Sequence, residues 1–191
     1  MQDLINRVQK FIVSHDKPGS LSIILFTGYS VVGPLDAWIS TPQLYLGGAV
    51  DTDNRLIQPT FNWTRNSNML DCYEGGEVLV LLDCPCLFVQ GSNHAEAELL
   101  AAGVWDNDNN AKDASTYGLT EAINGVLRRA ECASISAADL YAEIHEEAAS
   151  DISRGKARAL PVHLINSKQH RSVVLRRCDL RGLEGRSLGL S

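Results

Sequence analysis

Residues 77–84, EVLVLLDC, decide the fold class. Five consecutive apolar residues run from Val78 to Leu82, without the polar and apolar alternation of a strand that faces water on one side. The segment SLSIILFTGY at residues 20–29 has the same character. Strands of this kind are covered on both faces, so the two segments predict an α/β fold with a mostly parallel sheet flanked by helices.

Three helices are predicted from the spacing of apolar residues. Residues 2–14 are amphipathic, and the DKPGS segment that follows supplies a proline and a glycine that end a helix. The helix predicted over residues 117–130 places four apolar side chains on one face: Leu119, Ile123, Val126 and Leu127. Residues 136–149 begin with Ser136 and Asp139, a variant of the capping box, and this helix is expected to bury Leu140, Ile144 and Ala148.

The remaining apolar segments predict further strands. LPVHLIN at residues 160–166 and RSVVLRRC at residues 171–178 are both expected to be strands. EAELLAAGVW at residues 96–105 fits either a core strand or a helix, because alanine and leucine suit both. We expect a single domain over residues 1–178, followed by a loose tail over residues 179–191.

The composition excludes several classes of protein. With 191 residues, 45% of them hydrophobic, the chain is long enough for one sizeable core. The net charge of −6 argues against a nucleic-acid-binding role. No stretch approaches about 18 consecutive apolar residues, the length of a membrane span. The five cysteines are an odd number at irregular spacing, which does not fit a disulfide framework. We therefore expect a cytoplasmic protein with reduced thiols, no cofactor and no membrane partner.

Two cysteines, Cys84 and Cys86, follow the apolar run and flank Pro85. A free cysteine most often behaves as a small, inert apolar residue, and a reactive nucleophile is the alternative. A zinc site needs about four ligands, and only His94 lies nearby in the sequence. No metal site is predicted.

The order of these segments resembles that of the caspase-like peptidases, in particular the metacaspase-related domains common in fungi. One strand ends in FTGYS at residues 26–30, and a second ends in LLDCPC at residues 81–86, about 55 residues later. The segments ELLAAG, PVHLIN and RSVVLRR follow in the same order. The resemblance covers nearly all of residues 1–178 and implies a three-layer caspase-like fold that lacks the family's first strands.

Both catalytic positions that the resemblance implies are changed in this chain. The first strand of the family ends in a pattern like Y-x-G-H-G, so FTGYS places Tyr29 where the histidine belongs, and no histidine occurs from residue 16 to residue 93. The second strand ends in L-L-D-x-C, which places Pro85 at the nucleophile position, with Cys86 or Cys84 as a surrogate. A phenol with a pKa of about 10 is a poor base at neutral pH. The resemblance therefore implies a degenerate dyad.

The resemblance also implies a substrate-binding role for two acidic residues. Asp83 corresponds to an acid that lines the pocket for a basic side chain, and Asp36 is assigned to the rim of the same cleft. The alternative for Asp83 is a capping role at the end of its strand. An acidic cleft would bind arginine or lysine peptides without cutting them.

These observations predict a pseudoenzyme that binds another protein, as a decoy, a regulator of an active homologue or an assembly subunit. Two alternatives remain: a cysteine peptidase with an irregular site that uses Cys86 or Cys84, and an α/β protein whose function is unrelated to its caspase-like fold. The family's first strands would lie beside strand 21–26, so this strand is expected to be an open edge. A second subunit, the N-terminal helix or a missing N-terminal fragment would cover it.

Overall fold

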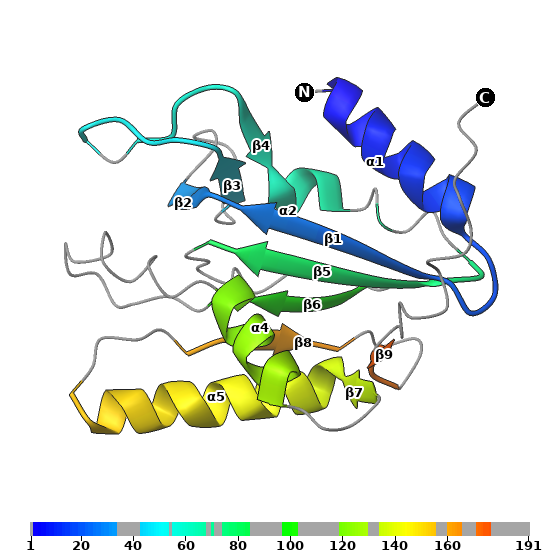
Figure 1. Ribbon diagram of the computed structural model, residues 1–191. Helices are drawn as coiled ribbons and strands as arrows, with labels where there is room; N and C mark the ends of the chain where they lie inside the picture. The colour runs from blue at the N-terminus through cyan, green and yellow to red at the C-terminus, as the bar shows by residue number, and fades with distance from the viewer. Residues whose placement is uncertain are drawn as a thin grey trace, which may run out of the picture.

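The computed structural model describes residues 2–33, 43–53, 55–67, 70, 74–84, 97–102, 119–129, 134–155, 160–165 and 171–176. The helices in these ranges are α1 (Gln2–His15), α2 (Trp63–Asn66), α4 (Leu119–Arg129) and α5 (Ala137–Ser153). The strands are β1 (Leu21–Thr27), β2 (Tyr29–Gly33), β3 (Gln43–Gly47), β4 (Thr60–Asn62), β5 (Glu77–Asp83), β6 (Glu98–Ala101), β7 (Ser134–Ser136), β8 (Val162–Leu164) and β9 (Val174–Arg176) (Figure 1). The predicted tail and the site residues Asp36, Pro85 and Cys86 lie outside the described residues.

The main sheet has four strands in the order β1-β5-β6-β8. Strands β1, β5 and β6 are parallel, and β8 is antiparallel to β6. This topology confirms the prediction of an α/β fold with a mostly parallel sheet. It also decides the ambiguous segment 96–105, whose core residues 98–101 form a strand.

Two smaller sheets accompany the main one. Strands β2, β3 and β4 form an antiparallel sheet, and β7 pairs with β9. Strand β2 follows β1 after a single residue, Gly28, so one nearly continuous extended segment contributes to two sheets. The predicted strand in residues 171–178 exists as β9, and its partner is β7 rather than a strand of the main sheet.

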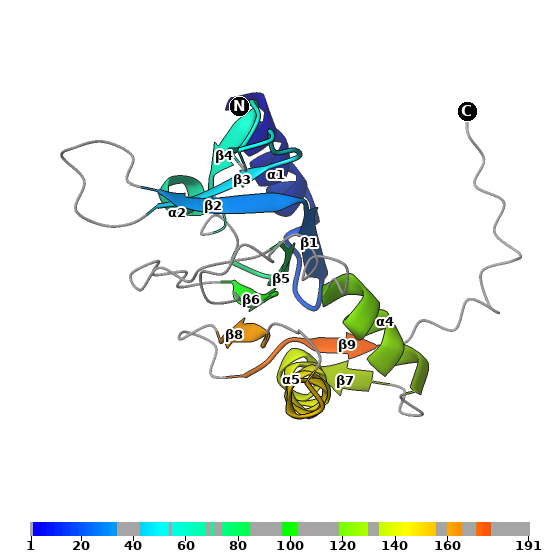
Figure 2. The same ribbon diagram turned by 90° about the vertical axis from the view of Figure 1, so that its left-hand side faces the viewer.

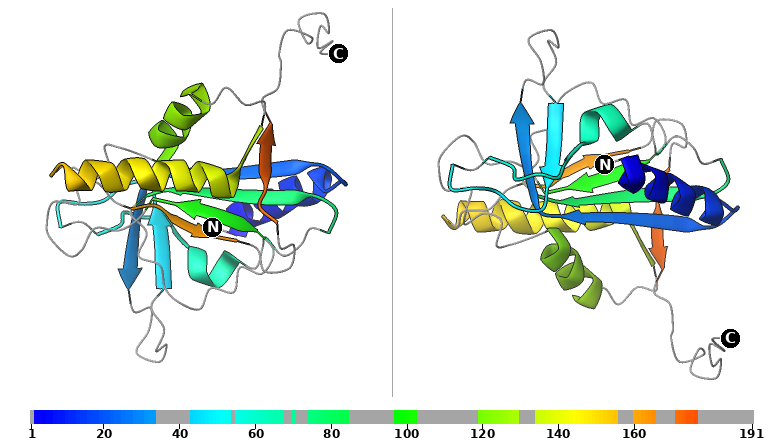
Figure 3. Two further views of the ribbon diagram at one scale, coloured as in Figure 1. Left: turned by 90° about the horizontal axis from the view of Figure 1, so that it is seen from below. Right: turned by 90° about the horizontal axis from the view of Figure 1, so that it is seen from above.

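Helices cover both faces of the main sheet. Figures 2 and 3 show α1 and the small β2-β3-β4 sheet on one side, and α4 and α5 on the other. On the first side, Ile12 of α1 shares a core with Val80 of β5. On the second side, Leu100 of β6 packs with Val126 of α4 and Leu140 of α5. The apolar run of β5 is therefore covered on both faces, as its sequence predicts.

Strand β1 differs from β5 in this respect. It lies at the edge of the main sheet, and its Ile23 and Leu25 side chains are 47% and 50% exposed. The prediction that residues 20–29 are covered on both faces is therefore wrong for one face of β1. The cores beneath α4 and α5 are built on β5 and β6, and of the β1 side chains they include only Leu21.

The helices follow the predicted patterns with one exception. In α5, the Ser136 hydroxyl accepts the Asp139 N–H at 3.0 Å, as the capping pattern predicts, and the three apolar residues expected in the core, Leu140, Ile144 and Ala148, are buried. In α4, Leu119, Ile123 and Val126 are buried, but Leu127 is 39% exposed. Leu127 lies about 100° around the helix axis from Val126, at the margin of the apolar stripe. Among the described helices, none is long and apolar enough to cross a membrane.

Candidate functional site

The carboxyl ends of β1 and β5 bring together the two segments that carry the resemblance. Thr27 lies opposite Asp83 in the parallel register, and the N–H of Gly28 donates to the Asp83 carbonyl oxygen at 3.3 Å. Tyr29 follows on one strand and Cys84 on the other. The described parts of the two segments, residues 26–30 and 81–84, therefore meet at one edge of the sheet, where α/β proteins commonly place their sites.

Gly28 allows the chain to pass from the main sheet into the small one. Its φ of +156° is rarely adopted by residues with side chains, and a Cβ atom at this position would lie 2.7 Å from the carbonyl oxygen of Gly47. The close approach of these two backbones requires glycine. Gly28 therefore fixes where Tyr29 emerges from the sheet.

Tyr29 presents an aromatic side chain at this edge. It lies opposite Gly47 in the β2–β3 register, next to a position without a side chain, and it is 43% exposed. Val31, two residues further along β2, is also exposed. A half-exposed tyrosine offers both a ring and a hydroxyl group to a partner, a combination that is enriched in protein interfaces.

Asp83 caps helix α4. Its Oδ1 accepts the N–H of Leu119 at 2.7 Å. Its Oδ2 accepts the N–H of Thr120 at 3.2 Å and the Thr120 hydroxyl at 2.6 Å. Both carboxylate oxygens are thus engaged by the first turn of α4, which is the capping role that the sequence left open for Asp83. Its role in substrate binding stays a prediction.

Cys84 lies in the core next to the site. It is 3% exposed and belongs to the same apolar cluster as Leu82 and Ala101. Reactive cysteines are normally accessible and lie close to positive charge, whereas cysteines buried among apolar side chains are inert. The environment of Cys84 is of the second kind, and the surrogate-nucleophile role of Cys86 stays a prediction.

Three histidines lie in the described part of the chain, and each belongs to another element. His15 ends α1, where its Nδ1 lies 2.8 Å from the Phe11 carbonyl oxygen. His145 is on α5, with its ring centroid 5.5 Å from that of Tyr141. His163 is on β8 and is packed and hydrogen-bonded, as predicted. None of the three is on β1, β2 or β5, and His94 and His170 lie outside the described residues.

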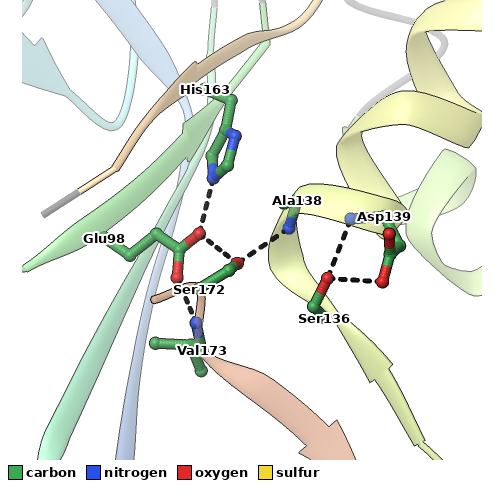
Figure 4. Close-up of polar contacts among 7 residues, drawn as sticks. All are labelled: Glu98, Ser136, Ala138, Asp139, His163, Ser172 and Val173. Atoms are coloured by element: carbon green, nitrogen blue, oxygen red, sulfur yellow. Dashed lines mark hydrogen bonds and ion pairs between the residues drawn. The ribbon is translucent and has the colours of Figure 1, made fainter. Parts of the chain in front are cut away.

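A buried carboxylate, Glu98, forms a second polar cluster, which the sequence pattern did not predict (Figure 4). Glu98 is on β6 and is 2% exposed. Its Oε1 lies 2.6 Å from His163 Nε2 and also accepts the Ser172 hydroxyl at 2.6 Å. Its Oε2 accepts the Val173 N–H. One carboxylate thus joins β6, β8 and the segment that precedes β9.

The same segment caps helix α5 (Figure 4). The Ser172 hydroxyl accepts the Ala138 N–H at 2.9 Å, and the Val173 carbonyl oxygen accepts the Ala137 N–H at 2.8 Å. Ser172 and His163 both direct their polar atoms to Glu98, so the serine does not hydrogen-bond to an imidazole base as a catalytic nucleophile does. The arrangement is structural.

Several interactions determine the ionisation of Glu98. Burial alone would raise its pKa, but the hydrogen bonds from His163, Ser172 and Val173, together with the charge of His163, lower the pKa below its ordinary value. The carboxylate is therefore ionised at neutral pH. One signal in the sequence could have indicated the pair, because Glu98 and His163 are each a polar residue within an apolar strand segment.

Within the described ranges, no group of three or more His, Cys, Asp or Glu residues is arranged to hold a metal ion. A scan against protein-family models finds no match, and a search of curated proteins finds none either. The function of the chain is therefore inferred from the geometry at the carboxyl edge of β1 and β5.

Proposed function

We propose that the chain is a cytoplasmic, catalytically inactive caspase-like protein of the fungal metacaspase-related type that acts by binding another protein. Tyr29 is the observation that carries the proposal. At the position that resembles the family's histidine, the chain has a half-exposed phenol. A phenol with a pKa of about 10 is a poor general base at neutral pH.

The nucleophile position supports the same conclusion. Pro85, which occupies it, has no thiol, and neighbouring Cys84 is buried in the core. Changing one member of a catalytic pair usually removes most of the rate advantage, and here both positions differ. A scaffold that has lost both reacting groups still offers a surface for recognition.

The proposed binding surface is the exposed face of β2 at this edge, which consists of Tyr29 and Val31. Tyrosine is among the residues that contribute most to binding energy at protein interfaces. The carboxylate of Asp83 is engaged by α4, so Tyr29 rather than Asp83 is the side chain expected to make the main contact. The partner is a protein or peptide, and an active caspase-like homologue fits this description.

Peptidase assays test the inactive state. Fluorogenic peptides with arginine, lysine or aspartate before the reporter group are incubated with the wild-type chain, with the Cys84→Ala and Cys86→Ala variants, and with the double variant that carries both substitutions. We expect no hydrolysis above the level of the double variant, and no stoichiometric labelling by a thiol-directed peptide probe. Labelling of Cys86, with hydrolysis abolished by Cys86→Ala, would establish the peptidase alternative instead.

Binding assays test the surface. In an affinity pull-down, the proteins retained by the immobilised wild-type chain are compared with those retained by Tyr29→Ala and by Leu127→Ala. Leu127→Ala is the control, because it truncates a similarly exposed apolar side chain on α4. We expect the retained partner, identified by mass spectrometry, to be lost from Tyr29→Ala and kept by Leu127→Ala. Equal retention by all three chains would contradict binding at this edge and favour an unrelated function.

A further inference from the structure

Among the strands that the structure describes, β1 pairs on one side only, with β5, so its outer edge is an open sheet edge. Its sequence, LSIILFT, contains no charged residue and no proline. Proteins normally protect an open edge strand with charge, proline, a bulge or a covering segment, because its free backbone groups pair readily with another strand. The edge also carries Ile23 and Leu25, which are both about half exposed. These features leave the edge open to pairing with another strand.

The hydrogen bonds of β1 show which residues face outward. Just before the strand, the Ser20 carbonyl oxygen accepts the Glu77 N–H at 2.8 Å, and just after it the Gly28 N–H donates to Asp83. Backbone groups of successive residues in a strand point to opposite sides. The backbone N–H and C=O groups of the even-numbered residues therefore point to β5. Those of the odd-numbered residues point to the open edge, and these residues are Leu21, Ile23, Leu25 and Thr27. In the described part of the chain, no strand lies beside them.

We propose that this edge pairs with β1 of a second copy of the chain, antiparallel and around a twofold axis at Ile24. In this register Ile23 lies opposite Leu25 of the partner subunit, and Thr27 lies opposite Leu21 of the partner subunit. Every outward-facing residue then meets another outward-facing residue, so each free donor finds an acceptor. The interface is isologous, as in most homodimers.

Charge and side-chain packing favour a second copy as the occupant. Each chain has a net charge of −6, but residues 21–27 are uncharged, so the paired strands bring no like charges together. The half-exposed Ile23 and Leu25 become cross-strand neighbours and cover each other, which stabilises antiparallel pairs. Figure 2 shows α1 on one side of the main sheet and α4 and α5 on the other.

Light scattering coupled to gel filtration tests the proposal. The wild-type chain is expected to have about twice the mass of one 20.8 kDa chain. Leu25→Pro removes an outward N–H and places ring atoms where the partner would lie, while the even-numbered residues that bond to β5 are unchanged. We expect this variant to be monomeric with unchanged circular dichroism. Ile23→Lys, which adds the charge that protected edges carry, is expected to be monomeric as well.

Leu127→Lys is the matched control, because it adds the same charge at an exposed apolar position on α4. We expect it to remain a dimer. A wild-type chain that is monomeric at all concentrations contradicts the proposal. This holds even if the edge of β1 binds a peptide from another protein. A dimer that both edge variants leave intact contradicts it too. If Leu25→Pro fails to fold, Ile23→Lys provides the same comparison.

Oxidative cross-linking tests the register. The twofold axis places Ile24 opposite Ile24 of the partner subunit with Cα atoms about 4.5 Å apart, within the range that a disulfide spans. Ile24→Cys should therefore form a covalent dimer above the wild-type background, and Ile23→Cys, which faces a leucine, should not. Equal cross-linking of the two variants contradicts this register. None of these readouts depends on the function proposed for Tyr29.

Discussion

The carboxylate of Asp83 accepts the Thr120 hydroxyl at 2.6 Å and the Thr120 N–H at 3.2 Å. A strand thereby supplies the cap of a helix that begins 36 residues later in the chain. The residue that most resembles a substrate-binding acid thus also stabilises the fold. Its substitution must be assessed for stability before any loss of binding is interpreted.

Replacement of Asp83 by alanine is expected to destabilise the protein by about 1–2 kcal/mol, because the first turn of α4 loses its acceptor. Asp83→Asn is expected to cost less, since the amide oxygen can still accept one N–H group. Urea denaturation of the two variants measures the difference. If Asp83→Ala unfolds at the same urea concentration as the wild type, the capping role is wrong.

Asp16, between α1 and β1, is expected to make stability depend on pH. Its carboxylate accepts the N–H groups of Glu74 at 2.8 Å, Gly75 at 2.8 Å and Gly76 at 2.7 Å. These bonds, first that from Glu74, lower the pKa below its ordinary value of 3.8 and outweigh the opposite effect of desolvation. Since the folded-state pKa is the lower one, the stabilisation is complete well above pH 3.8 and is lost as the pH falls through the folded-state value.

The Asp16→Asn variant tests this dependence, because its amide does not titrate. We expect it to melt at a lower temperature than the wild type near neutral pH, and the difference to shrink in acid. Thermal melts at about pH 7 and about pH 3 make the comparison. A difference that is the same at both pH values would show that the charge of Asp16 has no role.

Gly28→Ala is expected to be strongly destabilising, because the added Cβ would lie 2.7 Å from the Gly47 carbonyl oxygen. The strained backbone angle adds to the cost, which we expect to be about 1–3 kcal/mol in total. Gly48→Ala is the control, since an added Cβ there meets no atom within 4 Å. Chemical denaturation of both variants should show a large effect at residue 28 alone, and equal effects would contradict the close approach.

The sequence predicts the elements whose pattern is local. Residues 77–83 of the quoted segment form the core strand β5, and Ser136 caps α5, because both patterns are set by neighbouring residues in the chain. The errors occur where tertiary packing decides. Leu127 belongs to the apolar stripe of α4 by spacing, yet it is 39% exposed and is not among the described residues of the core beneath α4. Ile23 is apolar and lies on a predicted core strand, yet it is 47% exposed.

At the candidate site too, local sequence patterns predict some features, and tertiary packing decides the others. The strand patterns bring Tyr29 and Asp83 to one edge, because parallel strands align their carboxyl ends. The Glu98 cluster could not be predicted in this way, because Ser172 lies 74 residues from Glu98 and only the packing of β6 against the segment before β9 joins them. The carboxylate of Asp16 likewise binds amides 58 to 60 residues away.

Glu98→Gln is expected to destabilise the protein more than any of the substitutions at Asp83 or Asp16. The amide has one acceptor oxygen, so its NH2 group must face either the Val173 N–H or the side chains of His163 and Ser172. A buried polar group left without a hydrogen-bond partner costs about 1–3 kcal/mol, and more where the lost partner was charged. Because the pKa of Glu98 is lowered from its ordinary 4.5, the advantage of the wild type should be full above this pH and should decline as the pH falls further.

Two further variants separate the effect of the Glu98 charge on stability from the effect of its hydrogen bonds. Ser172→Ala removes one hydrogen bond to Glu98 and the acceptor of the Ala138 N–H, so we expect a loss of about 1–3 kcal/mol. Because this hydrogen bond also helps to lower the pKa of Glu98, the pH dependence of stability should be weaker than in the wild type but should not vanish. Glu121→Gln, at an exposed position on α4, should leave the stability unchanged. If Glu98→Gln is as stable as Glu121→Gln at neutral pH, the cluster does not hold β8 and the start of α5 together.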